Sequence, residues 1–241
     1  MTLSREQGKA ELRERVWTAL DAASAVEDDT AHGRIPAFHG AEAAARRLAD
    51  LPTWRSAKIV KVVPDTAQEP VRALALEQGK VVYMAVPRLA AEAPFYVLDP
   101  ARLSVPPAVA ANRRKVPTLT SAADVDELAP VDLVVLGSVA VDPTGARIGK
   151  GAGYSDIEAA LLTEAGLITE RTVIVTTVHR LQVVNAVPTQ AHDVKVDLIV
   201  TPEEVIACPG PRTAARIRWE DLPEEKIAAI PALAKRRAER S

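Results

Sequence analysis

The sequence predicts an α/β protein whose mainly parallel sheet is flanked by helices. Short β-branched runs alternate with helical patterns along the chain. Several of these runs end in turn signals such as Pro64-Asp65 and Thr201-Pro202, and a Gly-rich segment over residues 145–156 separates an apolar run from a helical pattern. Parallel sheets of this kind bind ligands beyond the carboxyl ends of their strands. We therefore expect a ligand site at that edge.

Helices and strands alternate in the N-terminal part of the chain. Leu12, Val16 and Leu20 recur at helical spacing, which predicts an amphipathic helix with Ser4 as its candidate N-cap. Gly79 is the expected C-cap of a later helix, because glycine readily adopts the left-handed conformation that ends helices. The elements expected here are a helix over residues 4–26, a polar loop over 27–40, a helix over 41–51 that stops near Pro52, a strand over 58–63, a helix over 68–78 and a strand over 80–86.

The middle of the chain is less regular. Pro-rich segments between residues 90 and 130 predict surface loops inserted between regular elements. Residues 131–141 form an apolar run typical of a strand covered on both faces by helices, and the Gly-rich segment follows it directly. The later elements expected are a helix over 156–164, strands over 172–178 and 196–200, and a tail with a short helix and a frayed basic end. Together they predict a single domain over residues 1–241.

Composition excludes several classes of protein. The 30 basic and 32 acidic residues leave a net charge of -2, and the few aromatic residues are not interleaved with basic ones, which argues against nucleic acid as a partner. One cysteine, Cys208, excludes an intramolecular disulfide and fits a reducing cytosol. The N-terminal residues are charged, and no apolar run reaches the ~20 residues of a membrane span. We expect a cytoplasmic protein with no membrane association.

The Gly-rich segment is the strongest candidate for a binding site. Closely spaced glycines let several backbone N–H groups converge on one anion, and the following helix adds the partial positive charge of its N-terminus. Arg147 and Lys150 supply full positive charges. The spacing matches neither the Walker loop nor the dinucleotide-binding fingerprint. On these residues alone, a phosphate site and a flexible turn with solvated charges both remain open.

The segment VDLVVLGSVAVDPTGARIGKGAGYSDIE resembles the strand and loop of the 5-formyltetrahydrofolate cyclo-ligases, also called methenyltetrahydrofolate synthetases. The loop of that family reads Gly-x-Arg-Leu-Gly-x-Gly-x-Gly-Tyr-Tyr-Asp-Arg. A second block, Gln182 followed by VPTQAHDVKVDLIVTPEEV, is similar to a later segment of the family, and Lys9-x-x-x-Arg13 matches its phosphate-contacting Lys and Arg. The resemblance covers most of the chain. It implies a Rossmann-like fold similar to the ribose-5-phosphate isomerase and CoA-transferase-like superfamily.

The resemblance also implies a reaction: ATP- and Mg²⁺-dependent conversion of 5-formyltetrahydrofolate to 5,10-methenyltetrahydrofolate through a phosphorylated formyl group. It gives catalytic roles to Arg147, Lys150 and Asp65, the last about where the family keeps a Glu beside the folate, and it makes Asp156 the Mg²⁺ carboxylate. The nucleotide-binding residues that it implies are Lys9, Arg13, Gly149, Gly151, Ala152, Gly153 and Tyr154. The implied partner is a small-molecule folate, and the protein is either a monomer or a homodimer.

Departures from the family pattern keep other functions open. Ser155 and Ile157 replace the second Tyr and the following Arg of the loop, and Ala152 stands where Lys or Gly is common. Such changes are similar to those of a divergent branch of the family with a suggested link to thiamine metabolism. One alternative is therefore a nucleotide- or folate-binding paralogue without ring closure, and another is an enzyme that uses the loop on a different phosphate-bearing metabolite. His179 and His192 are each either ligand contacts or structural residues.

Overall fold

The computed structural model describes residues 5–190 and 193–240. One sheet has the strand order β10-β9-β8-β5-β1-β2-β3-β4. Its four central pairings, from β9 through β8, β5 and β1 to β2, are parallel, and the three outer ones are antiparallel. This confirms the predicted α/β fold with a mainly parallel sheet. The strands are β1 (Ile59–Val62), β2 (Val81–Ala85), β3 (Phe95–Leu98), β4 (Ala122–Ala123), β5 (Leu133–Leu136), β8 (Val173–Thr177), β9 (Leu198–Val200) and β10 (Val205–Ala207), with a separate hairpin of β6 (Ala140–Val141) and β7 (Arg147–Ile148).

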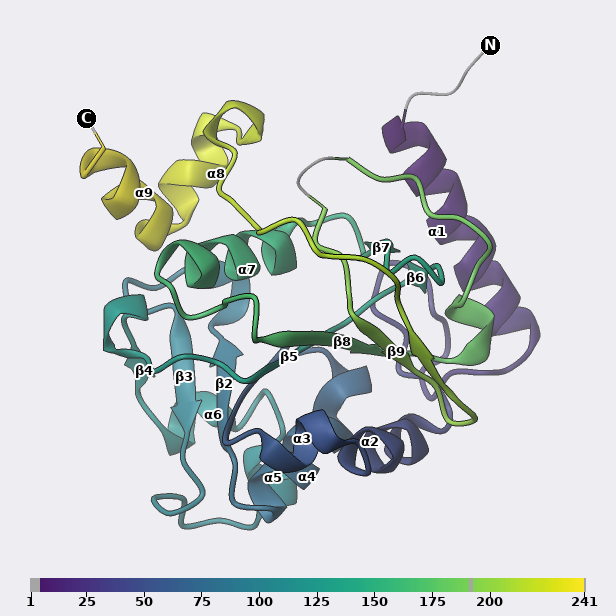
Figure 1. Cartoon of the computed structure of the whole chain (residues 1–241), viewed down its shortest axis with the longest axis horizontal. Helices are drawn as coiled ribbons and strands as arrows, with labels where there is room; N and C mark the ends of the chain where they lie inside the picture. Colours follow the sequence, from purple (N-terminus) through teal and green to yellow (C-terminus); the bar gives the residue numbers. More distant parts are fainter. Residues whose placement is uncertain (1–4, 191–192, 241) are drawn as a thin grey trace.

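Helices cover both faces of the sheet (Figure 1), with α7 on one face and α2 to α5 on the other. Successive side chains of a strand point to opposite faces. In β5, Leu133 and Val135 accordingly pack into the cluster beneath α2 and α4, whereas Val134 and Leu136 pack into the cluster beneath α7. The helices are α1 (Arg5–Ala22), α2 (Ala41–Ala49), α3 (Pro52–Ser56), α4 (Glu69–Glu77), α5 (Pro107–Ala110), α6 (Val116–Leu119), α7 (Tyr154–Glu164), α8 (Glu224–Ala229) and α9 (Pro231–Ala238).

The chain reverses its direction across the sheet between β1 and β5. From β1 it passes through α4 to β2 on one side, and from β5 it passes through α7 to β8 on the other. Because α4 and α7 lie on opposite faces, their connections leave a crevice outside the carboxyl ends of β1 and β5. Pro64-Asp65 and the Gly-rich segment therefore meet at the same edge, as the strand endings predicted.

The expectation of irregular loops between residues 90 and 130 was wrong in part. Phe95–Leu98 forms β3, which pairs antiparallel with β2, and the short β4 extends the sheet further. Prolines at the flanks obscured this strand in the sequence, although they lie outside the residues that need ladder hydrogen bonds. The two helices of this segment, α5 and α6, each carry Pro in the first turn, where its missing N–H costs nothing.

Several boundaries also differ from those expected. The run 131–141 divides into β5 and β6, and the Gly-rich segment contains β7, so it is partly a hairpin. The helix expected over 41–51 ends at Ala49, and Pro52 begins a new helix because proline suits the first helical position. The first helix ends at Ala22, and Val26 instead bridges Phe38. The candidate N-cap Ser4 lies outside the described residues.

The C-terminal tail is folded rather than frayed. Ile230 and Leu233 are fully buried and join the cluster beneath α7. The basic residues of α9, expected to be a solvated run, form ion pairs with acidic partners: Lys235 and Arg236 with Asp126, Lys235 also with Asp124, and Arg237 with Glu224. The helical pattern of the tail is too short to predict burial. Its apolar residues belong to the core because they pack in the same cluster as α7.

Candidate functional site

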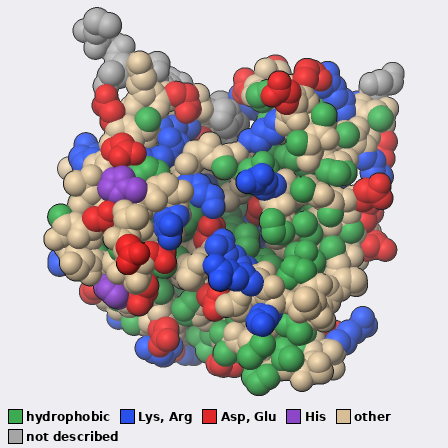
Figure 2. Space-filling model, turned by 180° about the vertical axis from the view of Figure 1, so that it is seen from behind, with side chains coloured by type: hydrophobic (Ala, Val, Ile, Leu, Met, Phe, Trp, Pro, Cys, Tyr) green, Lys and Arg blue, Asp and Glu red, His purple; other side chains and the backbone are tan. Residues whose placement is uncertain are grey.

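A cavity of about 890 Å³ opens at the reversal point of the sheet, between the ends of β1 and β2 and the Gly-rich segment. Lys and Arg side chains gather around the hollow in the face shown in Figure 2. The sequence-predicted site residues all line this cavity: Lys9, Arg13, Asp65, Arg147, Gly149, Lys150, Gly151, Ala152, Gly153, Tyr154 and Asp156. The fold thus brings together residues from three distant parts of the sequence, while their individual roles stay predictions.

Two glycines shape the loop that enters α7. Gly151 and Gly153 have φ values of 101° and 70°, a left-handed conformation that side-chain-bearing residues rarely adopt. Gly153 is the N-cap of α7 and offers no side-chain hydrogen bond, so the first amides of the helix have no side-chain cap. Gly145 has a different task, because a Cβ there would lie 2.2 Å from the carbonyl oxygen of Val196. It permits close packing outside the cavity.

Helix α1 brings two cations to the cavity, and one of them contacts the loop. The buried Lys9 Nζ lies 2.8 Å from both carboxylate oxygens of Asp193 and 3.1 Å from Gln190 Oε1. Arg13 Nε donates a hydrogen bond to the carbonyl oxygen of Gly149 at 2.8 Å. Lys9 therefore connects the first helix with the second sequence block. His192 of that block lies outside the described residues.

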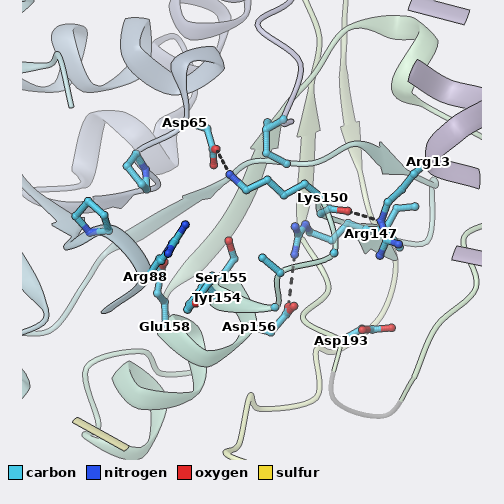
Figure 3. A pocket seen from close by; sticks show the side chains of 18 of the residues that line it. Arg13, Asp65, Arg88, Arg147, Lys150, Tyr154, Ser155, Asp156, Glu158 and Asp193 are labelled. Carbon is cyan, nitrogen blue, oxygen red and sulfur yellow. Dashed lines mark hydrogen bonds and ion pairs between the residues drawn. The ribbon is translucent and has the colours of Figure 1, made fainter. Parts of the chain in front are cut away.

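Arg147 is buried beneath the loop, and much of its guanidinium is already engaged. Its Nε donates to Ser138 Oγ at 3.1 Å, its Nη2 to the carbonyl oxygen of Gly137 at 2.8 Å, and its Nη1 lies 3.5 Å from Asp156 Oδ1. These bonds orient both Arg147 and the Asp156 carboxylate (Figure 3). Any bond from Arg147 to a phosphate would use the N–H groups that remain of its five donors.

Lys150 extends from the loop toward the end of β1. Its Nζ lies 3.3 Å from Asp65 Oδ1, so the charged groups of two proposed catalytic residues are paired across the cavity (Figure 3). Lys150 is exposed whereas Asp65 is partly buried. An exposed pair of this kind contributes little to stability, so Lys150 can exchange Asp65 for an anionic ligand at small cost.

The lining acids of the cavity each have a cationic partner: Glu6 and Asp193 pair with Lys9, Asp65 with Lys150, Asp156 with Arg147 and Glu158 with the buried Lys61. Three exposed arginines on the wall, Arg88, Arg113 and Arg114, have no hydrogen-bond or ion-pair partner for their side chains within the described residues. We call these three the arginine rim. Unmatched positive charge in the lining favours an anionic ligand.

The turn that carries Arg88 is strained. Arg88 and Leu89 have φ values of 58° and 54°, although neither is glycine, and the fully buried Leu89 anchors the turn. A left-handed conformation costs roughly 1–2 kcal/mol per residue. Such strain persists where the surrounding packing imposes it, and it is common at binding sites. In the view of Figure 3, Arg13 and Arg88 lie on opposite sides of the loop residue Lys150.

The wall near Arg88 also carries apolar surface. Its contributors come from the ends of β1 and β2, the loop after α1, the α6 helix and β7: Pro64, Met84, Val86, Pro87, Ile35, Pro117 and Ile148. Ile35 and Met84 are buried, so they form a fixed floor. An apolar wall with few convergent polar groups suits a flat ring system. The cavity thus combines a cationic loop with an apolar wall.

Sequence reasoning missed Lys226, which reaches the loop from α8. Its Nζ donates to the carbonyl oxygen of Ala152 at 2.6 Å and lies 4.9 Å from the centre of the Tyr154 ring. Burial lowers the pKa of the Lys226 ammonium, and the nearby Asp156 charge opposes this shift. No local pattern could have indicated the contact, because α8 lies in the segment expected to be a tail.

His179 has a structural position. Its ring nitrogen Nδ1 accepts a hydrogen bond from the Leu181 backbone at 3.3 Å, its ring lies 6.4 Å from that of Phe38, and it does not line the cavity. Burial lowers the pKa of the His179 imidazole. The sequence left open whether His179 contacts a ligand or has a structural role, and its contacts support the structural role.

The described part of the chain contains no cluster of three or more His, Cys, Asp or Glu residues that could hold a metal ion by themselves. The Asp156 carboxylate, beside a cationic loop, still fits Mg²⁺, because this ion often takes one or two protein carboxylates and completes its coordination with substrate phosphate oxygens and water. None of the described helices is long and apolar enough to cross a membrane.

Comparisons with known proteins identify a family and relatives that this chain is similar to. The profile of the 5-formyltetrahydrofolate cyclo-ligase family matches residues 5–202. The chain is 36% identical over 238 residues to a methenyltetrahydrofolate synthase domain-containing protein of Mus musculus, covering 93% of this chain and 62% of the relative. The Homo sapiens protein of the same name is 35% identical over 243 residues, covering 95% and 61%. The chain thus spans about three fifths of the length of these relatives.

A solved structure supports the fold. The NMR structure of Aquifex aeolicus 5,10-methenyltetrahydrofolate synthetase superimposes with a TM-score of 0.55 and 21% sequence identity, covering 87% of this chain and 97% of that one. At this identity the likeness concerns the fold alone.

Proposed function

The chain belongs to the 5-formyltetrahydrofolate cyclo-ligase family, and from this premise we propose that it converts 5-formyltetrahydrofolate to 5,10-methenyltetrahydrofolate at the expense of ATP. One observation carries the proposal: the glycine loop, its cations and an apolar wall line the same cavity of about 890 Å³. A nucleoside triphosphate can bind to the cationic loop, and a pterin ring can pack against the apolar wall. Phosphoryl transfer requires that these two binding sites be adjacent.

The nucleotide occupies the loop end of the cavity. Gly149, Gly151 and Gly153 allow backbone amides to approach phosphate oxygens without Cβ obstruction, and the uncapped start of α7 adds partial positive charge. Lys9 and Arg13 flank the loop from α1, and Lys150 supplies a mobile ammonium. Asp156, held by Arg147, is the carboxylate that would share Mg²⁺ with the phosphates.

The folate lies against the wall formed by the ends of β1 and β2. Asp65, at the end of β1, can accept hydrogen bonds from the pterin, while Met84 and Ile35 pack against its ring. The arginine rim can bind the carboxylates of the glutamate moiety, since arginine and carboxylate groups form charge-assisted, often bidentate pairs. Each ligand thus meets groups of complementary chemistry.

The chemistry follows from this arrangement. The formyl oxygen is a poor leaving group, and transfer of the terminal phosphoryl group of ATP to this oxygen releases ADP and gives an iminium phosphate. N10 then attacks the formyl carbon and loses its proton, which closes the ring, and cleavage of the C–O bond releases phosphate and leaves the methenyl product. Lys150 and Arg147 neutralise negative charge on the transferred group, which with positioning is the main contribution that a protein makes to phosphoryl transfer.

The test is a turnover assay on the purified chain with MgATP and 5-formyltetrahydrofolate. We expect the absorbance of the methenyl product to rise together with ADP, and Asp156→Asn to abolish most of this rise because it removes the proposed Mg²⁺ carboxylate. A matched control is Asp126→Asn, which neutralises an exposed carboxylate paired with α9 rather than one in the cavity. Absence of product at high enzyme concentration would contradict the proposal.

One observation favours a second function, ligand binding without ring closure. Ile157 occupies the position of the family's loop Arg, and it is buried in the cluster beneath α7, so no cation replaces that Arg at this position. A diverged paralogue would bind MgATP or the folate without turnover. Calorimetry that shows binding of either ligand, combined with no product in the assay above, would select this function.

A further inference from the structure

The C-terminal helix α8 contacts the glycine loop from outside the cavity. Lys226 donates its hydrogen bond to Ala152 and stacks its ammonium on the Tyr154 ring, but it does not line the cavity itself. Ala152 and Gly153 do line it. The loop therefore separates Lys226 from the space that a ligand would fill. The family profile ends at residue 202, so this contact comes from a part of the chain beyond the match.

The hydrogen bond from Lys226 fixes the orientation of one peptide plane. The described peptide bonds are all trans, and in a trans peptide the C=O and the following N–H point in opposite directions. Because the carbonyl of Ala152 points toward Lys226, the N–H of Gly153 points away from it. Gly153 lines the cavity and Lys226 does not, so an N–H that points away from Lys226 can face the cavity.

The position of Lys226 is costly for a cation. It is half-buried, it lies beside the uncapped N-terminus of α7, and the positive end of a helix repels positive charge. Its ammonium lies near the loop glycine, since a Cβ on Gly153 would be 3.2 Å from Nζ. The anchors of α8, the buried Ile227 and Ile230, hold it there. An ammonium kept in this position despite burial and repulsion from the helix N-terminus is placed to orient the loop and to attract an anion.

We propose that Lys226 is a positioning residue of the phosphate loop: by holding the Ala152 carbonyl from behind, it directs the Gly153 amide at the nucleotide phosphates. Arg13 holds the other end of the loop through the Gly149 carbonyl. The first and the last parts of the chain thus fix the two ends of the loop. Lys226 also places a positive charge near Asp156, in the region where Ile157 has replaced the family's Arg. The inference rests on the proposed nucleotide site.

The first arm of the test needs no ligand. In Lys226→Met, which keeps the aliphatic stem, we expect the backbone NMR order parameters of Gly151 and Gly153 in the free protein to fall and the Gly153 amide shift to move. Lys226→Arg should retain most of the wild-type values because it keeps a donor. Lys235→Met is the matched control, since it removes an exposed cation from the neighbouring helix α9. Unchanged Gly153 signals in Lys226→Met would overturn the inference.

The second arm measures binding of MgATP and of 5-formyltetrahydrofolate by calorimetry. We expect Lys226→Met to weaken MgATP binding about tenfold, the lower range for loss of a hydrogen bond to a charged group, with folate binding unchanged and partial rescue by arginine. Equal weakening of both ligands would overturn the inference, as would no weakening of MgATP. If the wild type binds no MgATP, the proposed function fails, and the first arm alone decides whether Lys226 orders the loop.

Discussion

The cationic side chains of the cavity differ in whether they have hydrogen-bond and ion-pair partners within the protein. Lys9 and Arg147 are buried and held by several acceptors, so their charges are fixed in place before any ligand arrives. The arginine rim is exposed and has no side-chain partners within residues 5–190 and 193–240. Preorganised cations favour a defined phosphate geometry, whereas exposed arginines without fixed partners tolerate a flexible carboxylate chain. The two ends of the cavity should therefore respond differently to mutation.

A double variant of the rim tests this difference. We expect Arg113→Gln/Arg114→Gln to weaken 5-formyltetrahydrofolate binding about tenfold, because each exposed ion pair contributes up to about 1 kcal/mol, and to leave MgATP binding nearly unchanged. Calorimetry with each ligand measures both. Lys115→Gln removes a cation from the same turn that does not line the cavity and serves as the control. Equal losses for the two ligands would show that the rim does not discriminate between them.

The single thiol should be chemically inert. Burial, assisted by the charges of Asp197 and Asp142, raises the pKa of Cys208 to about 11 from an ordinary value of 9.0. Since only the thiolate reacts, the reactive fraction at pH 8 falls about 100-fold relative to an unperturbed thiol. We expect iodoacetamide labelling to accelerate about tenfold per pH unit from pH 8 to 10. A plateau near pH 9, read by mass spectrometry, would show an ordinary thiol.

At the scale of elements, the two C-terminal helices join the core by a few apolar residues. Leu233 and Ile230 are fully buried beneath α8 and α9, while the basic residues of α9 stay near the surface. Because α8 carries Lys226, the packing of these helices also determines where that ammonium lies. Stability of this segment and order of the loop should therefore be coupled.

We expect Leu233→Ala to lower the free energy of unfolding by about 2–4 kcal/mol, since it removes a fully buried side chain and leaves a cavity. Urea denaturation followed by circular dichroism measures the change. Lys235→Ala on the same helix breaks only exposed ion pairs, with Asp124 and Asp126, and should change the free energy by less than about 1 kcal/mol. Equal, small effects of both substitutions would mean that α9 does not pack on the domain.

At the scale of the whole molecule, the cavity connects α1, the ends of two strands, the glycine loop and the segment before β9. A ligand bound there would contact parts of the chain that lie far apart in the sequence. Binding to the native state alone stabilises it by RT ln(1 + [L]/Kd). The domain organisation and the choice between monomer and homodimer stay predictions, which light scattering on the purified chain can address.

We accordingly expect MgATP at about 100 times its Kd to stabilise the protein by about 2.7 kcal/mol and to raise its Tm by about 5–10 °C. Differential scanning fluorimetry measures the shift. Asp156→Asn should reduce it, and EDTA should reduce it in the wild type by removing Mg²⁺. An identical shift with and without EDTA would argue that no metal ion takes part in nucleotide binding.

Local signals predicted the parts of the fold that depend on neighbours in sequence. Leu12, Val16 and Leu20 are all buried on one helix as their spacing indicated. Gly79 adopts the expected left-handed conformation with φ 76°, one residue after the actual C-cap of α4, Gln78. The run over 131–141 was correctly recognised as core, although it forms two separate strands. The strand β3 was missed because its pairing with β2 is a long-range contact that prolines at its flanks concealed.

The alternation of strands and helices, the family and the members of the glycine loop could all be predicted from the order of residues, because periodicity and motif spacing are properties of consecutive residues. Tertiary packing is what brings Lys9 to Asp193, Lys150 to Asp65 and Lys226 to the carbonyl oxygen of Ala152. Each of these contacts joins residues far apart in the chain. Their geometry depends on how the sheet and its helices pack, and local sequence patterns cannot predict this packing.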